Sequence, residues 1–231
     1  MEFLRHIFGF DSDSPLLFTQ FYFWAFFALV YSVFAIIMEV GSRGAQEKGR
    51  NTRLHLRNIF LLAVSWFFYY KTSGLFLLIL VFITLSDWLI AERIHNAKIE
   101  KRETRAKWWL TLSVVIDLGL LCYFKYAYFF TNVVNDLLGT EFMVFDIFAY
   151  IGNGLSASGR FMVDSIILPV GISFYLFQVM SYTIDVYRGQ VKPVKSILDF
   201  GFYVSFFPSL VAGPIVRANE FIPQLYRPFR L

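Results

Sequence analysis

The sequence predicts an all-α protein, a polytopic bundle of helices within a membrane. Hydrophobic residues make up 57% of its 231 residues and charged residues only 16%, whereas an ordinary soluble domain has about 25% charged residues. The apolar residues form long runs, and most of the basic residues fall between those runs. Because a helix needs about 20 apolar residues to cross a bilayer core about 30 Å thick, runs of this length indicate membrane segments.

Five apolar runs contain the expected membrane segments, and they cover residues 16–38, 58–91, 108–130, 165–187 and 197–216. The second run is too long for one crossing. It is interrupted by Lys71-Thr72-Ser73-Gly74, which predicts one helix near 58–70 and another near 75–91. We therefore expect about six membrane segments.

The basic residues between the runs predict the orientation. They concentrate in three loops, at 41–57, 92–107 and 188–195, which alternating crossings place on the same side of the membrane. That side is expected to be cytoplasmic, with the N-terminus outside, because short cytoplasmic loops are enriched in Lys and Arg. The acidic loop at 131–164 is then external. Since orientation accounts for the net charge of +4, we expect the lipid bilayer as a partner and no nucleic acid.

Residue types that bind metals or cofactors are scattered along the chain. The three histidines, His6, His55 and His95, lie in the N-terminal segment and in two of the basic loops, so no metal site is predicted. A degenerate glycine motif begins at Gly152, but no strand precedes it, and an external loop explains it better than a dinucleotide site. We therefore expect no bound cofactor.

Polar residues mark one face of the run at 165–187. Gln178, Ser181, Asp185 and Arg188 follow helical spacing and share one stripe. Charged side chains at membrane depth nearly always face protein or water, so the stripe is expected to face the interior of the bundle. Asp185 and Arg188 can pair with each other or with neighbouring helices, or both can lie near the cytoplasmic interface with their charges in water. The stripe predicts a lined cavity or channel but specifies no reaction.

Two prolines interrupt the last apolar run, where residues 203–217 read YVSFFPSLVAGPIVR. Proline removes a backbone donor and clashes with the preceding turn, so Pro208 and Pro214 predict a bent or re-entrant element. Such a break survives at membrane depth where protein or a water-filled cavity satisfies the freed backbone groups. The alternative is a simple kinked helix that ends in an anchoring arginine, Arg217.

Several stretches resemble the membrane-bound O-acyltransferase (MBOAT) family. They are LPVGISFYLFQVMSYTIDVYRG at 168–189, DFGFYVSFFPSLVAGPIVR at 199–217 and FIPQL at 221–225, with CYFKYAYFF at 122–130 and RNIFLLAVSWFFYY at 57–70. The similarity is closest to the alginate O-acetyltransferase branch and to the related D-alanyl transfer proteins of teichoic acid. It covers roughly residues 16–231.

The resemblance implies a bundle of helices around a tunnel that crosses a bacterial cell membrane. A cytoplasmic acyl donor, such as acetyl-CoA or an acyl carrier, approaches one mouth. A polysaccharide acceptor, or an extracytoplasmic acyltransferase partner, approaches the other. The residues expected to line or support the tunnel are Gln178, Ser181, Asp185, Arg188, Pro208, Ser209, Gly213, Pro214 and Arg217. Ser209 departs from the resemblance, because similar proteins often have Gln or His at this position.

The resemblance also implies a catalytic histidine within a Trp-His-Gly context, and this sequence contains no such motif before Leu231. We therefore expect residues 1–231 to be the N-terminal portion of a transmembrane domain that is incomplete at the C-terminus, and assign no catalytic residue within it. Two alternatives are a transporter or flippase subunit and a structural membrane partner without acyltransferase activity. A downstream Trp-His-Gly in an apolar segment would favour the acyltransferase.

Overall fold

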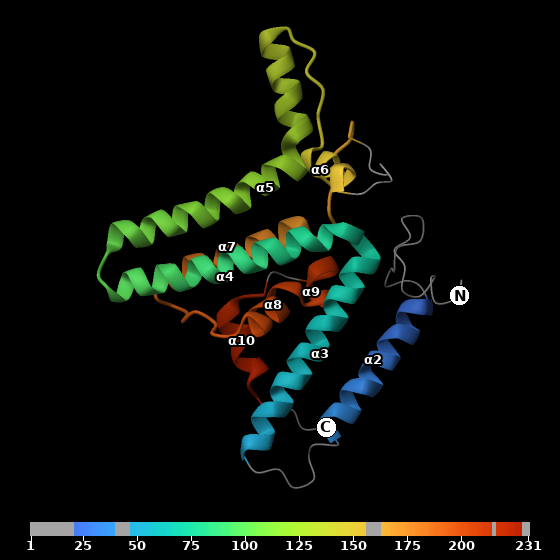
Figure 1. Ribbon diagram of the computed structural model, residues 1–231, viewed down its shortest axis with the longest axis vertical. Helices are drawn as coiled ribbons and strands as arrows, with labels where there is room; N and C mark the ends of the chain where they lie inside the picture. The colour runs from blue at the N-terminus through green and yellow to red at the C-terminus, as the bar shows by residue number, and fades with distance from the viewer. Residues whose placement is uncertain (1–20, 40–46, 156–162, 214–215, 228–231) are drawn as a thin grey trace.

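The computed structural model describes residues 21–39, 47–155, 163–213 and 216–227, and within these ranges every regular element is a helix (Figure 1). The elements are α2 (Phe21–Glu39), α3 (Glu47–Ser73), the 3₁₀-helix η1 (Gly74–Phe76), α4 (Leu77–Ile99), α5 (Glu103–Leu138), α6 (Ile147–Leu155), α7 (Ile172–Tyr187), α8 (Ile197–Ser205), α9 (Phe207–Ala212) and α10 (Ala218–Leu225). The predicted all-α class is confirmed for these residues.

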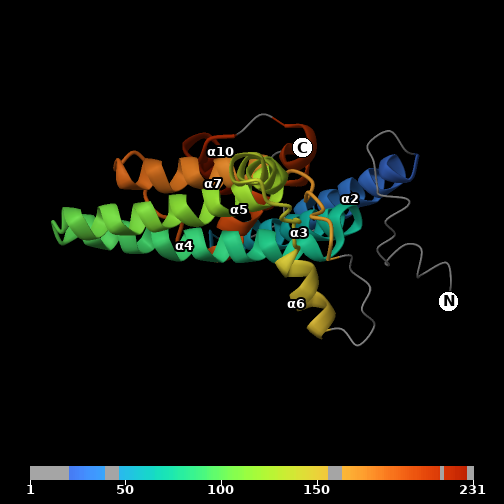
Figure 2. The same cartoon turned by 90° about the horizontal axis from the view of Figure 1, so that it is seen from above.

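Helices α4, α5 and α7 lie side by side and contain the main core (Figures 1 and 2). Their buried faces supply most of its apolar side chains, among them Leu80, Ile83, Leu121, Tyr175 and Val179. A tight turn joins α4 to α5. Lys101 adopts a positive φ of 56°, and the amide of Arg102 donates to the carbonyl of Ala97, which is the hydrogen bond of a Schellman motif. This turn makes α4 and α5 antiparallel neighbours.

The long second run folds as two helices that change direction at η1. Gly74 has a φ of 59° there, so the predicted interruption at 71–74 is confirmed. Helix α3 begins earlier than expected, at Glu47, because the polar residues before 58 continue the helix. It packs against α2 on one side and α8 on another.

The last apolar run is broken into short helices. Helix α8 begins after Ser196, whose hydroxyl accepts a hydrogen bond from the amide of Asp199 at 3.3 Å. It ends before Phe206, and α9 then begins with Pro208 in its first turn, where a missing N–H costs nothing. Pro208 therefore breaks the helix as expected. Pro214 lies outside the described residues.

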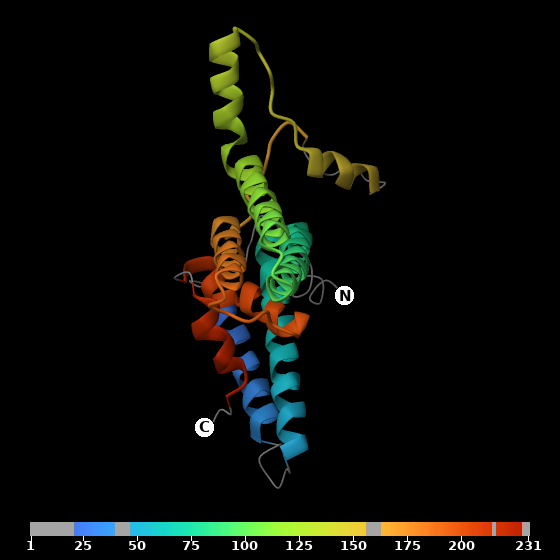
Figure 3. The ribbon, with the colours of Figure 1, turned by 90° about the vertical axis from the view of Figure 1, so that its left-hand side faces the viewer.

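The expected external loop at 131–164 is partly helical. Helix α5 continues past residue 130 to Leu138, and α6 follows within the same stretch. Gly139, with a φ of 64°, ends α5 in the left-handed conformation. Figure 3 shows the last part of α5 standing clear of the other helices. The apolar side chains of Leu137 and Leu138 are exposed there, and such residues continue a helix readily.

Two helical stretches within the described residues are long and apolar enough to cross a membrane, Leu54–Ile99 and Glu103–Leu138. A shorter apolar helix covers Phe23–Met38. Helix α7 begins at Ile172, later than the expected 165, because Pro169 and Gly171 precede it in a turn. The count of six membrane segments stays a prediction.

Candidate functional site

Gln178, the first residue of the polar stripe, connects α7 to α8. Its side chain is buried, and its amide nitrogen donates to the backbone carbonyl of Tyr203 at 2.8 Å. The hydroxyl of Tyr203 in turn donates to the carbonyl of Val216 at 3.0 Å, beyond the second proline. Gln178 and Tyr203 therefore hold the broken segment against α7.

The other residues of the stripe lie in different environments. Asp185 is buried, Ser181 is half-buried, and Arg188, at the end of α7, is exposed. Among the described residues no ion pair joins Asp185 to Arg188. The backbone carbonyl of Asp185 accepts the amide of Gln190 at 2.9 Å and so closes the end of α7. The stripe is therefore buried at Gln178 and Asp185 and reaches solvent at Arg188.

The broken segment packs closely enough to require glycine at two positions. Gly171 has a φ of 73°, and a Cβ there would collide with the backbone carbonyl of Leu210 in α9. A Cβ on Gly213 would collide with the backbone of Ser209. Ser209 itself is buried, and its hydroxyl donates to the carbonyl of Phe206 at 2.8 Å. Small residues therefore let α9 approach the start of α7.

Of the remaining predicted residues, Pro208 and Arg217 are exposed. Arg217 precedes α10, and its backbone carbonyl accepts the amides of Glu220 and Phe221, both at 3.1 Å. The backbone of Arg217 therefore caps the start of α10, and its side chain is exposed.

A hydrogen-bond network around Asp199 joins α3, α8 and α10. The side-chain amide of Asn58 donates to Oδ1 of Asp199 at 2.8 Å, and the hydroxyl of Tyr226 donates to Oδ2 at 2.8 Å. Arg57 donates to Oδ1 of Asn58 and to the carbonyls of Leu225 and Arg227. Burial, together with the neighbouring Asp199 carboxylate, raises the pKa of Tyr226. The hydroxyl therefore stays protonated and can donate.

A pocket of about 400 Å³ opens beside this network. It is lined by His55, Lys192, Pro193, Val194, Lys195, Ser196, Asp199, Ile222 and Tyr226. Its basic side chains come from two different loops of the sequence, the one that ends at residue 57 and the one at 188–195. Two lysines, Lys192 and Lys195, lie in its lining together with the Asp199 carboxylate.

The third basic loop lies close to the second. The Lys98 ammonium sits 4.5 Å from the centre of the Tyr187 ring and 2.9 Å from a carboxylate oxygen of Glu103. The indole nitrogen of Trp88 donates to the carbonyl of Val194 at 2.7 Å. The segment at 187–195 therefore lies beside His55 of the first predicted basic loop and beside Lys98 of the second.

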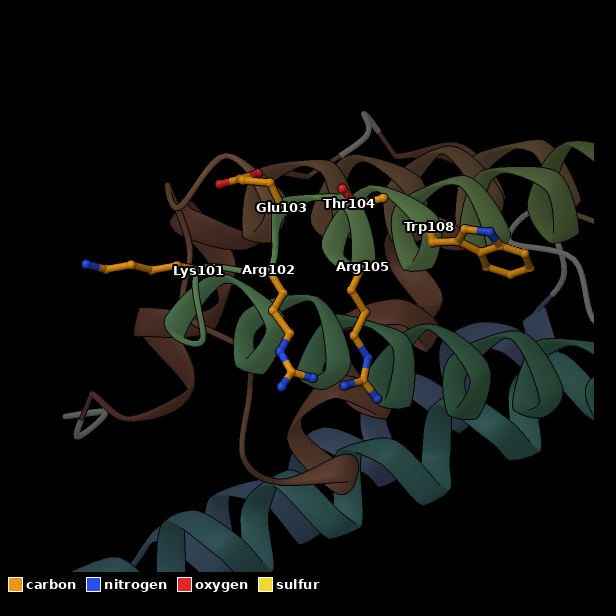
Figure 4. Close-up of a pocket in the computed structure, with 6 residues that line it drawn as sticks. All are labelled: Lys101, Arg102, Glu103, Thr104, Arg105 and Trp108. Atoms are coloured by element: carbon orange, nitrogen blue, oxygen red, sulfur yellow. The ribbon is translucent and has the colours of Figure 1, made fainter.

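A second pocket, of about 610 Å³, lies at the turn between α4 and α5 (Figure 4). Its lining residues are Lys101, Arg102, Glu103, Thr104, Arg105 and Trp108. In Figure 4 the side chains of Arg102 and Arg105 extend in the same direction, while Lys101 points away. All these side chains are exposed, and neither pocket is lined by the polar stripe.

Two polar clusters were not predicted from the sequence. One is the Asn58–Asp199–Tyr226 network, and the other surrounds Asp87 and Asp117, described below. The available signal for the second was a single carboxylate within each of two apolar runs, which is unusual in a membrane segment. The pairing itself joins residues too far apart in the chain for any local pattern to show it.

Comparison with known proteins identifies the family. The chain is 39% identical over 168 residues to a protein named "Probable alginate O-acetylase AlgI" from Azotobacter vinelandii, and 38% identical to a protein of that name from Pseudomonas aeruginosa. The chain belongs to the membrane-bound O-acyltransferase family.

The similarity to these MBOAT proteins covers 73% of this chain but only about 30% of each relative. A more distant relative, 27% identical over 190 residues, is named "Peptidoglycan O-acetyltransferase" and comes from Helicobacter pylori. This similarity covers 72% of the present chain and 32% of the Helicobacter pylori protein. No family model and no solved structure matches the chain.

Proposed function

We propose that this chain is part of a membrane-bound O-acyltransferase that transfers an acyl group, here acetyl, to a cell-envelope or secreted polysaccharide. The observation that carries the proposal is the identity of up to 39% to proteins named as alginate O-acetylases. The peptidoglycan O-acetyltransferase among the relatives supports a polysaccharide acceptor more generally. The acceptor is either the polysaccharide itself or an extracytoplasmic acyltransferase that passes the group on.

The donor is proposed to be a cytoplasmic acetyl carrier, acetyl-CoA or an acylated carrier protein. Both contain phosphate, and the pocket that Lys192 and Lys195 line beside His55 offers two ammonium groups to such a group. The orientation that makes the basic loops cytoplasmic would expose this pocket to the donor. The N-terminus is then outside the bacterial plasma membrane.

Within this function the buried stripe and the broken segment are proposed to support the transfer path. Gln178 fixes Tyr203, which in turn fixes the chain after the break. The catalytic histidine implied by the family is proposed to come from outside residues 1–231. Residues of this chain would then bind, orient and enclose the substrates, and that histidine would take the proton from the acceptor hydroxyl.

The test is transfer of labelled acetyl from acetyl-CoA to a soluble alginate acceptor by the full protein in nanodiscs. Reversing charge in the pocket with Lys192→Glu should raise the KM for the donor, because one favourable contact with phosphate becomes repulsive. Lys107→Glu is the matched control, an exposed lysine on α5 outside both pockets. An equal change in the two variants would contradict the role of the pocket, and no transfer at all by the wild type would contradict the proposed reaction.

A further inference from the structure

Two carboxyl groups are buried in the centre of the unit formed by α4, α5 and α7. Asp87 of α4 is 1% exposed and Asp117 of α5 is 0% exposed. Ser113 of α5 and Thr183 of α7 complete the cluster, and both are fully enclosed as well. A buried carboxylate destabilises the fold unless a cation or hydrogen-bond donors offset its lost hydration, so each carboxyl oxygen needs a hydrogen-bond partner.

The hydroxyl groups of the cluster give a hydrogen bond to only one carboxyl oxygen, Oδ1 of Asp87. Ser113 has a single proton, and its oxygen lies 2.6 Å from Oδ1 of Asp87 and 3.2 Å from the Thr183 hydroxyl. Thr183 donates its own proton to the carbonyl of Met180 at 3.0 Å. Ser113 therefore donates to Asp87. Oδ2 of Asp87 and both carboxyl oxygens of Asp117 are left without a hydrogen-bond donor.

Among the described residues, no cationic side chain forms an ion pair with either acid. In the part of the chain that the structure describes, the ion pairs join Lys98 to Glu103 and Arg102 to Glu100, and none involves Asp87 or Asp117. Asp117 lies one helical turn after Ser113 on the same face of α5, and Ser113 bonds to Asp87, so the two carboxyl groups face each other between α4 and α5. A titratable group of α7 that interacts with Asp87 is the hydroxyl of Tyr182, which accepts a hydrogen bond from the amide of Val194 at 3.0 Å. Two like charges this close in a dry interior cannot both persist.

We propose that Asp87 and Asp117 form a proton-binding pair, in which a protonated Asp117 donates a hydrogen bond to Oδ2 of Asp87. One bound proton removes one of the two negative charges and gives a partner to two of the three unsatisfied oxygens. Asp87 then accepts two hydrogen bonds, from Ser113 and from Asp117. The pair connects α4 to α5, and Ser113 of α5 contacts Thr183 of α7. The bound proton therefore helps to hold α4 and α5 against α7, the helix that carries Gln178.

The proposal predicts an asymmetric response to substitution at Asp117. Asp117→Asn replaces the acid with a neutral amide of the same shape, which can still donate to Asp87, so the melting temperature in nanodiscs should remain close to that of the wild type. Asp117→Ala removes the donor and opens a space, so the melting temperature should fall clearly. Asp136→Asn is the matched control, because Asp136 is an exposed carboxylate on the same helix.

Infrared spectroscopy gives a direct reading of the bound proton. The wild type should show the carbonyl band of a protonated carboxylic acid at neutral pH, shifted in D₂O. The band should disappear in Asp117→Asn and persist in Asp136→Asn. If Asp117→Asn does not fold, the presence of the band in the wild type still decides whether a carboxyl group is protonated, and a change in the band's frequency, or its loss, in Asp87→Asn decides whether it belongs to this pair.

The competing occupant is a metal cation such as Na⁺. A cation site would be ionised, so the wild type would lack the protonated-acid band, Na⁺ would raise its melting temperature relative to choline, and Asp117→Asn would abolish that rise. Any of these results would overturn the proposal. A protonated-acid band that survives both Asp117→Asn and Asp87→Asn would overturn it equally.

Discussion

Substitution of Gly171 by alanine is expected to separate α9 from the start of α7. Gly171 has a φ of 73°, and a Cβ would meet the carbonyl oxygen and carbonyl carbon of Leu210, which are backbone atoms that cannot rotate away. The left-handed conformation costs a residue with a Cβ about 1–2 kcal/mol. Overpacking against fixed atoms adds about 1–3 kcal/mol. The free energy of unfolding of Gly171→Ala is thus expected to be about 2–5 kcal/mol lower than that of the wild type.

Two other glycines separate these contributions. Gly189 has a φ of 74° with nothing within 4 Å of its Cβ position, so Gly189→Ala should cost only the conformational part, about 1–2 kcal/mol. Gly119 lies within helix α5, also with nothing within 4 Å, so Gly119→Ala should stabilise by about 0.5–1 kcal/mol.

The assay is the melting temperature of each purified variant in the same nanodisc, where about 1 kcal/mol corresponds to a shift of about 2–4 °C for a chain of this size. The expected order of stability is Gly119→Ala, wild type, Gly189→Ala and then Gly171→Ala. Acetyl transfer should fall with Gly171→Ala and stay near the wild-type rate with Gly189→Ala. If Gly171→Ala is as stable as Gly189→Ala, the close contact between Gly171 and Leu210 is refuted.

Three further predictions concern the turn, the buried network and the orientation. Lys101→Gly should stabilise the protein by up to about 1 kcal/mol in thermal unfolding, because glycine accepts the φ of 56° without strain; Lys107→Gly, in a regular helix, should destabilise it by about 1 kcal/mol. Asp199→Ala should lower the free energy of unfolding by about 1–3 kcal/mol, since the buried side-chain amide of Asn58 loses its acceptor. After the exposed Cys122 is replaced by serine, a cysteine at Lys192 should resist an impermeant reagent in intact cells, whereas one at Thr140 should react.

Each of these has an outcome that would contradict it. Equal effects of the two lysine-to-glycine changes would mean that the α4–α5 turn is not strained. If Asp199→Ala lowered the free energy of unfolding by less than about 0.5 kcal/mol, water would be replacing the Asp199 carboxylate as the acceptor in the network. Labelling from the outside at residue 192 but not at 140 would reverse the proposed orientation.

Local features of the chain could be predicted from the sequence. The break at Pro208 follows from the missing amide of proline, and the interruption at 71–74 follows from a polar tetrapeptide that ends in glycine. Helix ends were predicted less well, since polar residues before 58 and apolar residues after 130 both continue helices. A helix boundary depends on the last hydrogen bonds, and hydrophobicity reports these only indirectly.

Contacts between distant residues could not be predicted. The face that carries Gln178 was visible as helical spacing, but its partner, the Tyr203 carbonyl, is a backbone atom that no pattern marks. Asn58 and Asp199 are 141 positions apart, and a single sequence contains no signal that joins them. The predicted pairing of Asp185 with Arg188 followed spacing alone, whereas one of these side chains is buried and the other exposed.

We propose that this chain is part of an enzyme that O-acetylates a polysaccharide. The acetyl ester content of the envelope and secreted polysaccharide measures that activity directly. The measurement compares a strain that lacks the gene with the same strain carrying the wild-type gene or the Gly171→Ala variant. Deletion should remove the acetyl esters, the wild-type gene should restore them, and the variant should restore them poorly. An unchanged ester content after deletion, in each polysaccharide that the cell produces, would contradict it.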